Sequence, residues 1–511
     1  MGAMKLLSCS NASDRSATHR ANIIIIMADD MGFSDLGCYG SAINTPNLNQ
    51  LAREGLRFTQ FYNCALCSPT RAALLTGLYP HKTGMGDLVN TKGQKRAPAY
   101  QGYLNDRCLT IAEALEPAGY QCFLSGKWHV GEHRPHWPLD RGFEEYYGLI
   151  SGASNYFTPK IDPKNRVRMI AENNTSLENF AEDFYFTDAI SDRAVKMLEQ
   201  SQNSDRPFFL YVSYTAPHWP LHALPEDIQK YQGKFSQGWD AIREQRTQRL
   251  IAEELIDKNW QLSQRDPRLE LWENIEHKEW EDMRMAVYAA QIDRMDRGIG
   301  KILSTVTKIG AQSNTLAIFL SDNGAESSNL AGNNPNMMPG SKETYMSYGI
   351  GWANVSNTPF RRYKKEVYEG GISTPFIARW PGVILPDRIT HQVGHAIDLM
   401  PTCLDIAGVP YPQQIENRRL SSLDGKSLLP ILQGKSREGH EFLYWECRGN
   451  RAIRQGQWKL LFDGNLKEWE LYNLEADRTE TQNLASDRPE IVTKMLEEWI
   501  RWAAEINAIG D

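Results

Sequence analysis

A cysteine followed at short spacing by a proline and an arginine is the most informative chemical feature of the sequence. The segment reads Cys67-Ser68-Pro69-Thr70-Arg71. Pro69 suits the first turn of a helix, and Ser68 or Cys67 can cap that helix. A helix N-terminus attracts anions through its free N–H groups, and Arg71 adds a fixed positive charge one turn later. The segment predicts an anion-binding site with a thiol at its mouth. The plainer alternative is a reduced, half-buried cysteine beside a structural arginine.

The same cysteine forms a C-x-x-C pair with Cys64, a spacing typical of redox and zinc sites. No second C-x-x-C is present to complete a four-thiolate zinc site, and eight cysteines in 511 residues are too few for a disulfide scaffold. A redox protein is therefore the weaker hypothesis, because it leaves the proline and the arginine after Cys67 unexplained.

Two short acidic segments have the composition of a metal site. Asp29 and Asp30 are adjacent carboxylates, and Asp322 and Asn323 form a second pair of oxygen donors. Neighbouring acids repel each other unless a cation or a proton intervenes. An all-oxygen ligand set suits a hard cation, Ca²⁺ or Mg²⁺, rather than zinc. A lone Asp-Asp pair is usually a strand-to-loop turn, but the second pair favours a metal site.

Several basic side chains have the chemistry needed to bind the oxygens of an anion. Lys127 and His129 are two residues apart, so that in an extended backbone both side chains point the same way. His218 follows an apolar segment and a proline, which places it on a loop. Three further histidines, His133, His136 and His222, match no zinc-hydrolase spacing and are interpreted as loop or rim residues.

These residues need elements that bring them together, and five continuous apolar segments predict buried parallel strands. The predicted strands are Asn22–Ala28, Gln121–Ser125, Pro207–Tyr214, Thr315–Ser321 and Thr374–Trp380. Helical patterns lie between them, for example at 110–118 and 188–200. The first four segments end at the polar residues described above. Because ligands in open α/β sheets bind beyond the carboxyl ends of strands, we expect one site at one sheet edge.

The rest of the chain divides by composition. Residues 221–285 are rich in Trp, Gln, Arg and Glu and predict a helical insertion that packs over or beside the sheet. Because this insertion starts just after His218, we expect it to form part of the wall around the pocket. From about Glu441, four short strands and a helix predict a small antiparallel sheet with one helix. The expected divisions are a flexible tail at 1–20, a catalytic domain at 21–435 and an α+β subdomain at 436–511.

Charge and hydropathy exclude some classes of protein. The net charge of −7 and the lack of a long basic run argue against a general nucleic-acid binder. No apolar run approaches the ~20 residues that a bilayer-spanning helix needs. Lys5-Leu6-Leu7-Ser8-Cys9 could be the remnant of a lipoprotein signal, which would mean a periplasmic or lipid-anchored location; without such a signal we expect a cytoplasmic protein.

The segment from Cys67 to Gly77 resembles the sulfatase signature, C-x-P-x-R followed by a small residue and, further on, T-G. Other motifs of that family follow in the right order along most of the chain. They are Asn22–Asp30, Gly126-Lys127-Trp128-His129, Ala216-Pro217-His218, Ser321-Asp322-Asn323-Gly324 and Tyr368-Glu369-Gly370-Gly371. The resemblance implies an alkaline phosphatase-like α/β fold and the hydrolysis of aryl or carbohydrate sulfate monoesters.

The resemblance also implies cofactors. A separate maturation enzyme would convert Cys67 to formylglycine, whose hydrated aldehyde is the nucleophile. Ca²⁺, with Mg²⁺ as an alternative, would be bound by Asp29, Asp30, Asp322 and Asn323 together with the modified Cys67. Arg71 would hold the hydrated aldehyde and the sulfate oxygens with the cation. The family pattern places an active lysine four residues before the aromatic of Y-E-G-G, which selects Lys364 over Lys365.

The remaining roles implied by the resemblance concern charge and protons. Asp322 would accept a proton from the nucleophile, and Lys127 and Lys364 would stabilise the sulfate oxygens. His218 would assist the departing alcohol together with Lys364. His129 would deprotonate the second hydroxyl, which expels sulfate.

Three other functions remain open. A phosphate- or phosphonate-ester hydrolase shares the scaffold, and sequence separates it poorly; a sulfated-glycan binder without activity and a C-x-x-C redox protein fit the residues less well. The sequence does not predict the alcohol part of the substrate, exo or endo action, or the oligomeric state. Residues near the motifs that could form the substrate rim and stack on a sugar or aryl ring are Tyr103, Asn155, Tyr156, Trp219, His222 and Trp352.

Overall fold

The computed structural model describes residues 20–508 except for 90–95, 160–167 and 331. The predicted flexible tail and the possible lipoprotein signal at Lys5–Cys9 lie outside the described residues, apart from Arg20. Among the residues that are described, no helix is long and apolar enough to cross a membrane.

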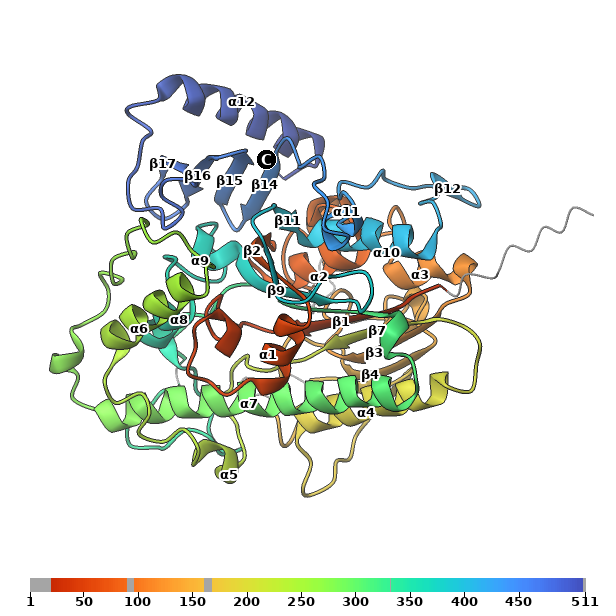
Figure 1. The fold of residues 1–511 in the computed structure, drawn as a ribbon, viewed down its shortest axis with the longest axis horizontal. Coiled ribbons are helices and arrows are strands. Elements are labelled where there is room, and N and C mark those ends of the chain that lie inside the picture. Colours follow the sequence, from red (N-terminus) through yellow and green to blue (C-terminus); the bar gives the residue numbers. More distant parts are fainter. Residues whose placement is uncertain (1–19, 90–95, 160–167, 331, 509–511) are drawn as a thin grey trace, which may run out of the picture.

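A large mixed sheet forms the centre of the molecule (Figure 1). Its strands run in the spatial order β10-β2-β9-β8-β1-β7-β3-β4-β5-β6, with β11 also paired to β2. Their bounds are β1 Asn22–Ala28, β2 Leu56–Tyr62, β3 Gln121–Gly126, β4 Glu145–Leu149, β5 Ile170–Glu172, β6 Thr175–Ser176, β7 Phe208–Ser213, β8 Thr315–Ser321, β9 Ser373–Arg379, β10 Arg388–Thr390 and β11 Gly394–His395.

Apolar runs make the middle strands of this sheet, because both faces of the sheet are covered. In β1, Ile23 and Ile25 pack into one hydrophobic core and Ile24 and Ile26 into another. Successive side chains of a strand point to opposite faces, so that a continuous apolar segment fills two cores at once. The predicted α/β architecture with a mostly parallel central region is confirmed.

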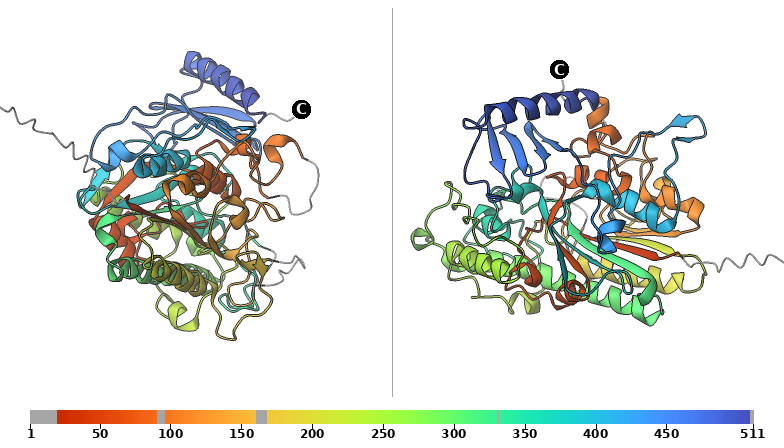
Figure 2. Two further views of the ribbon diagram at one scale, coloured as in Figure 1. Left: turned by 90° about the vertical axis from the view of Figure 1, so that its right-hand side faces the viewer. Right: turned by 45° about the horizontal axis from the view of Figure 1, so that its top comes forward.

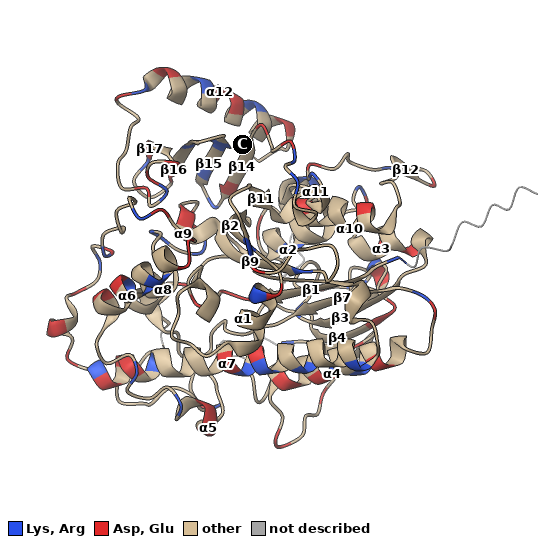
Figure 3. Ribbon diagram, viewed as in Figure 1, with Lys and Arg blue, Asp and Glu red and all other residues tan. Residues whose placement is uncertain are grey.

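Helices cover both faces of the sheet. Figure 1 shows α4 and α7 along one face, with α2, α3 and α10 on the other. The α-helices are α1 Pro46–Arg53, α2 Cys67–Thr76, α3 Ile111–Leu115, α4 Phe186–Ser201, α5 Pro225–Ile228, α6 Trp239–Ala252, α7 Lys278–Lys308, α8 Gly349–Ser356, α9 Glu369–Ile372, α10 Leu399–Ala407, α11 Leu429–Leu432 and α12 Pro489–Glu505. Lys, Arg, Asp and Glu of both signs are interspersed along α4 and α7 (Figure 3).

Two predictions about the main domain are wrong in part. The fifth predicted strand forms as β9, but it runs antiparallel to both of its neighbours, β2 and β8. An apolar run indicates that a strand is buried, but it does not indicate whether the strand runs parallel or antiparallel to its neighbours. The helix predicted at 110–118 is shorter: α3 spans Ile111–Leu115 behind a Thr110 capping box, and a 3-10 turn follows at Glu116–Ala118. Pro117 lacks the N–H that a continuing α-helix needs.

The C-terminal part forms the predicted antiparallel sheet and helix. The strands are β14 Leu443–Cys447, β15 Asn450–Gln455, β16 Trp458–Asp463 and β17 Glu468–Asn473, in sequence order. Figure 2 shows α12 lying across this sheet, on the side away from the main sheet. A small hairpin, β12 Gln414–Ile415 with β13 Arg418–Arg419, lies outside both sheets. The predicted domain boundary at 435/436 stays a prediction.

The insertion predicted at 221–285 contains α5, α6 and the first turns of α7. Its tryptophans pack inward: Trp239 and Trp272 lie edge-on to each other and to Trp352. Arg246 of α6 is buried and pairs with Asp35 at 2.7 Å. A cavity of about 1000 Å³ lies between residues 251–260, β2 and the C-terminal sheet, and none of the predicted catalytic residues line it. The role of the insertion as a pocket wall stays a prediction.

Candidate active site

Four adjacent strands bring the predicted residues to one edge of the sheet. The strands β8, β1, β7 and β3 are neighbours and run parallel, so their carboxyl ends lie side by side. Backbone hydrogen bonds continue beyond the strands: the Asp29 N–H donates to the Ala216 carbonyl and the Asp322 N–H to the Ala28 carbonyl. Lys127 N–H donates to the Ser213 carbonyl at 2.7 Å.

The nucleophile candidate is the first residue of α2. Cys67 is 3% exposed, and Leu66 is the N-cap residue in extended conformation. Neither Cys67 nor Ser68 caps the helix through its side chain, contrary to the prediction, because both lie inside the helix. Burial raises the pKa of the Cys67 thiol, although Lys127 and Lys364 oppose that shift. An unmodified Cys67 is therefore a poor thiolate nucleophile.

Arg71 is fully buried and faces the same edge of the sheet. Its guanidinium donates to Asp322 Oδ2 at 2.7 and 3.1 Å, to the Lys127 carbonyl at 3.3 Å and to the Ser213 hydroxyl. One turn of α2 separates it from Cys67. The predicted combination of helix N-terminus and fixed positive charge is present in the structure.

Each predicted lysine faces one of the paired carboxylates. Lys127 Nζ donates to Asp29 Oδ2 at 2.6 Å, and Lys364 Nζ donates to Asp30 Oδ1 at 2.5 Å. Both lysines are buried. Burial lowers the pKa of Lys364, but Asp30 and the other acidic groups around it together raise that pKa well above its ordinary value. The competitor, Lys365, instead pairs with Glu326 at 3.0 Å.

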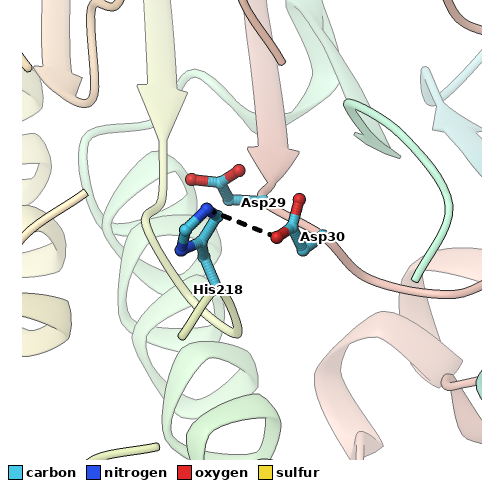
Figure 4. Close-up of side chains that lie close together, drawn as sticks. All are labelled: Asp29, Asp30 and His218. Carbon is cyan, nitrogen blue, oxygen red and sulfur yellow. Dashed lines mark ion pairs between the residues drawn. The ribbon is translucent and has the colours of Figure 1, made fainter. Parts of the chain in front are cut away.

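His218 lies against Asp29 and Asp30 on the loop that follows β7 (Figure 4). Its Nε2 is 3.4 Å from Asp30 Oδ2, and its Nδ1 is 2.6 Å from the Trp219 carbonyl. A carbonyl only accepts, so Nδ1 carries a proton, and Nε2 faces the acidic pair. Burial lowers the pKa of His218 to about 4, although Asp30 opposes that shift.

His129 is buried close to the same residues. Its backbone is not extended, contrary to our expectation. Its φ of 57° is left-handed, so the alternation argument for Lys127 and His129 is wrong. Burial, followed by the charges of Lys127 and Arg71, lowers the pKa of His129 well below its ordinary value. Gly152 lies against this ring: an added Cβ there would be 2.5 Å from His129 Nε2.

The side-chain oxygens of the two acidic segments are suitable ligands for a hard cation. Asp30 N–H donates to Asp322 Oδ1 at 3.2 Å and Asn323 Nδ2 to Asp30 Oδ1 at 2.7 Å, so both acidic segments meet. Three of their buried oxygens, Asp29 Oδ1, Asp30 Oδ2 and Asn323 Oδ1, accept no hydrogen bond from the described residues. A buried oxygen that accepts no hydrogen bond destabilises the folded protein unless a cation binds to it. Carboxylate and amide oxygens are the ligands of Ca²⁺ and Mg²⁺.

The cluster pairs side chains of opposite charge. Three carboxylates, Asp29, Asp30 and Asp322, face the three cationic side chains of Arg71, Lys127 and Lys364. Burial and the charge of Asp322 raise the pKa of Asp29 to about 8. Burial also acts to raise the pKa of Asp30, but His218 and Lys364 hold it below its ordinary value. A divalent cation would add positive charge to this cluster and favour an anionic ligand.

The predicted rim residues divide into two groups. Tyr156, His222 and Trp352 are fully buried, and their role in the substrate rim stays a prediction. Tyr156 supports the loop that carries His218, because its hydroxyl donates to the carbonyls of Thr215 and His218. The other three rim candidates are partly accessible. Tyr103 stacks on His136, and the Asn155 amide donates to the Lys342 carbonyl. The ring of Trp219 lies 4.5 Å from that of His218.

Three residues at this edge were not predicted from the sequence. Ser213 accepts from Arg71, Glu326 lies 3.9 Å from Lys364 Nζ and 3.0 Å from Lys365 Nζ, and Gly152 leaves room for His129. Glu326 lies two residues after the Ser321–Gly324 motif. This short spacing is the only sequence feature that could have indicated a role for Glu326 in the site. Nothing in the local sequence distinguishes Ser213 or Gly152.

Comparisons with known proteins give a consistent result. A family model described as Sulfatase matches residues 21–409, and one described as N-sulphoglucosamine sulphohydrolase, C-terminal, matches residues 360–504. An uncharacterized sulfatase of Schizosaccharomyces pombe is 35% identical, covering 97% of this chain and 95% of its own length. The arylsulfatase of Klebsiella aerogenes is 32% identical, covering 86% of this chain and 97% of its own.

A solved structure is similar over nearly the whole fold. The crystal structure of Ps i-CgsB in complex with k-i-k-neocarrahexaose is 28% identical, with a TM-score of 0.70, and the match covers 95% of this chain and 93% of that one.

Proposed function

The chain belongs to the sulfatase family and is a sulfuric ester hydrolase, and from this premise we propose that it cleaves carbohydrate sulfate monoesters with formylglycine at residue 67 and one bound Ca²⁺. The observation that carries the proposal is the meeting, at one sheet edge, of the α2 N-terminus, Arg71 and three buried oxygens without hydrogen-bond donors. A sugar substrate is supported by the carbohydrate named in the Ps i-CgsB complex.

Asp29, Asp30, Asp322 and Asn323 would hold the cation. When bound, it would supply positive charge beside the sulfate oxygens and the nucleophile. Its all-oxygen ligand set favours Ca²⁺ over a transition metal, and Mg²⁺ is the alternative. The hydrate of formylglycine would supply an attacking oxygen and a second hydroxyl, a group that an unmodified cysteine lacks.

The side chains of the site have distinct roles in this proposal. Arg71 is held by Asp322 and Ser213, which fixes its guanidinium toward the sulfate position. Lys127 and Lys364 present ammonium groups to developing negative charge on the sulfate oxygens. Because both lysines donate to carboxylates, their ammonium groups are held in place before the substrate binds.

Two histidines would move protons. His218 presents Nε2 to the site, because Nδ1 is bonded to the Trp219 carbonyl, and would assist the departing alcohol together with Lys364, whose ammonium group carries the proton to be donated. His129 is held neutral by burial and by neighbouring cations, which suits a base that takes the proton of the second hydroxyl. Asp322 would accept the proton of the attacking hydroxyl.

A substrate panel tests the proposal. The enzyme is produced with a maturation enzyme, and its formylglycine content is measured on peptides by mass spectrometry. Rates are compared for 4-nitrophenyl sulfate, 4-nitrophenyl phosphate and sulfated mono- and oligosaccharides. We expect sulfate esters to exceed phosphate esters and at least one sulfated sugar to exceed the aryl ester in kcat/KM. Faster phosphate hydrolysis by fully matured enzyme would overturn the proposal.

A further inference from the structure

The loop that carries Lys364 has no regular structure of its own. It lies between Phe360 and α9, and two of its non-glycine residues, Arg362 and Lys365, have left-handed backbones with φ of 68° and 77°. A left-handed non-glycine residue is held against its own preference, by about 1 kcal/mol or more. Contacts with other segments must therefore keep this loop in place.

Lys365 makes the contacts that join this loop to the active site. Its N–H donates to the Ala65 carbonyl at 2.8 Å, two residues before Cys67. Its own carbonyl accepts from Asn450 Nδ2 at 3.0 Å. The preceding residue, Lys364, donates its N–H to the Ala325 carbonyl at 3.1 Å, two residues after Asn323.

Asn450 belongs to the C-terminal sheet and is itself rigidly placed. It is the first residue of β15, directly after the two-residue turn Arg448-Gly449, whose φ values of 53° and 88° are those of a tight hairpin turn. The Arg448 guanidinium pairs with Asp87 at 2.9 Å, which ties the hairpin tip to the main domain.

The Asn450 amide has one consistent orientation. Its Oδ1 accepts from the Gly464 N–H at 3.1 Å, and its Nδ2 donates to the carbonyls of Lys365 and Cys447. The residue is 8% exposed. A flipped amide would place an oxygen against two carbonyls, so the donor toward Lys365 is determined by its neighbours.

We propose that Asn450 is a positioning residue for Lys364. Its hydrogen bond holds the Lys365 carbonyl, while the Lys365 N–H holds the segment before Cys67, so the C-terminal subdomain sets the distance between the lysine loop and the nucleophile. This inference rests on the proposed function, in which Lys364 stabilises the sulfate ester oxygens and assists the departing alcohol. The side chain of Lys365 takes no part in this link, because Glu326 and Ser328 hold it elsewhere.

The test is the dependence of the rate on the leaving group. A series of aryl sulfates of increasing phenol pKa is assayed with the wild type and with Asn450→Ala. If Lys364 is displaced, kcat/KM should fall most for substrates whose alcohol is a poor leaving group. We expect kcat/KM to fall about 10-fold for 4-nitrophenyl sulfate and about 100-fold for phenyl sulfate, so that the slope of log kcat/KM against phenol pKa steepens.

Two further variants separate positioning from general damage. Asn450→Asp keeps the acceptor for Gly464 but removes the donor to Lys365, and we expect the same steeper slope. Asn465→Ala removes an exposed amide of the same subdomain and should leave the slope unchanged. Melting temperature and formylglycine content are measured for every protein, and rates are normalised to the matured fraction.

The outcomes distinguish this inference from the proposed function. An active wild type with an Asn450→Asp variant of unchanged slope refutes the positioning role and leaves the function intact. A rate loss that is equal for all leaving groups also refutes it, because unfolding or poor maturation lowers every rate alike. A fully matured wild type without sulfatase activity refutes the function itself.

Discussion

Cys67 lies at a position where an unmodified thiol is a weak nucleophile. It is buried at the first residue of α2, and burial raises its pKa. We expect peptide mass spectrometry of active enzyme to show that residue 67 has lost its sulfur and gained an aldehyde oxygen. Cys67→Ala should lose essentially all activity, whereas Cys38→Ser, at a partly exposed thiol, should retain it. Full activity with only thiol at residue 67 would contradict the prediction.

Asp322 links the two halves of the site, because one of its oxygens bonds Arg71 and the other the Asp30 N–H. We expect Asp322→Ala to lose the bound metal and to lower kcat by at least about 100-fold. In the wild type, free Ca²⁺ at 100 times its Kd should add about 2.7 kcal/mol of stability over chelated enzyme. Asp322→Ala should show no such Ca²⁺-dependent shift in Tm.

The control for the metal prediction is Asp257→Ala, which removes an exposed carboxylate outside the site. Metal content is measured by elemental analysis of protein dialysed against Ca²⁺. An Asp322→Ala protein that binds one equivalent of metal as tightly as the wild type would show that this carboxylate is not a ligand.

Some of the residues that sequence could predict lie in motifs at the ends of apolar strands. Asp29, Lys127 and Asp322 were found in this way, and the parallel strands bring them together. Gly152 and Asn450 could not be found, because each matters only through a partner from another segment, His129 and Lys365. The Asn450 contact spans 85 residues of sequence. Such pairs leave no periodic or local signal.

At the scale of elements, β11 ends at the buried His395, and the 3-10 turn that leads from it to α10 ends at the buried Asp398. Burial lowers the pKa of His395 to about 3. Burial acts to raise the pKa of Asp398, but His440 and Arg437 outweigh it and lower that pKa to about 2. Below its ordinary pKa of 6.5, His395 is protonated in the unfolded chain but neutral in the folded protein until about pH 3.

The unfolded state therefore binds more protons in this range, and stability must fall as the pH is lowered from about 6.5 toward 3. One such proton contributes a slope of at most about 1.4 kcal/mol per pH unit. We expect His395→Asn to reduce the slope of the unfolding free energy between pH 4.5 and 6.5 by about that amount, measured by urea denaturation. His391→Asn, at an exposed histidine, is the control and should leave the slope unchanged.

Other elements were predicted with uneven success for physical reasons. β1 and β8 match their predicted bounds because a run of buried apolar residues has clear ends. The direction of β9 was missed, since burial on both faces is the same for parallel and antiparallel strands. The strand β2, Leu-Arg-Phe-Thr-Gln-Phe-Tyr, was not predicted because Arg57 and Gln60 interrupt its apolar pattern.

At the scale of the whole molecule, the C-terminal subdomain is not a detachable module. Trp445 and Leu461 from its strands and Trp499 from α12 belong to the same hydrophobic core as residues of α2 and α10. A buried ion cluster also crosses the boundary: Lys459 Nζ donates to Glu369 at 2.9 Å and to Glu480 at 2.7 Å. Glu369 is the glutamate of the Tyr368–Gly371 motif, five residues after Lys364.

Lys459→Met should therefore destabilise the protein by about 3–5 kcal/mol, because it removes the cation that the buried Glu480 pairs with and one of the two that the buried Glu369 pairs with, the other being Arg478. Guanidinium denaturation measures the change, and the exposed Lys467→Met is the matched control. Adding Glu480→Gln to Lys459→Met should recover part of the loss, since one uncompensated charge is then removed. A change below about 0.5 kcal/mol for Lys459→Met would mean that the cluster is not a net support.

The strand order of the main sheet also has a consequence for synthesis of the chain. β1 pairs with β7 and β8, so its last neighbour is complete only when Ser321 has been made. At about 5–20 residues per second, roughly 15–60 s separate the emergence of β1 from that of β8. Until Ser213 has been made, β1 lacks both of these neighbours, and until Ser321 has been made it lacks one of them. Cys67, which the finished fold buries, is still accessible then, so the strand order sets the time available for its proposed oxidation.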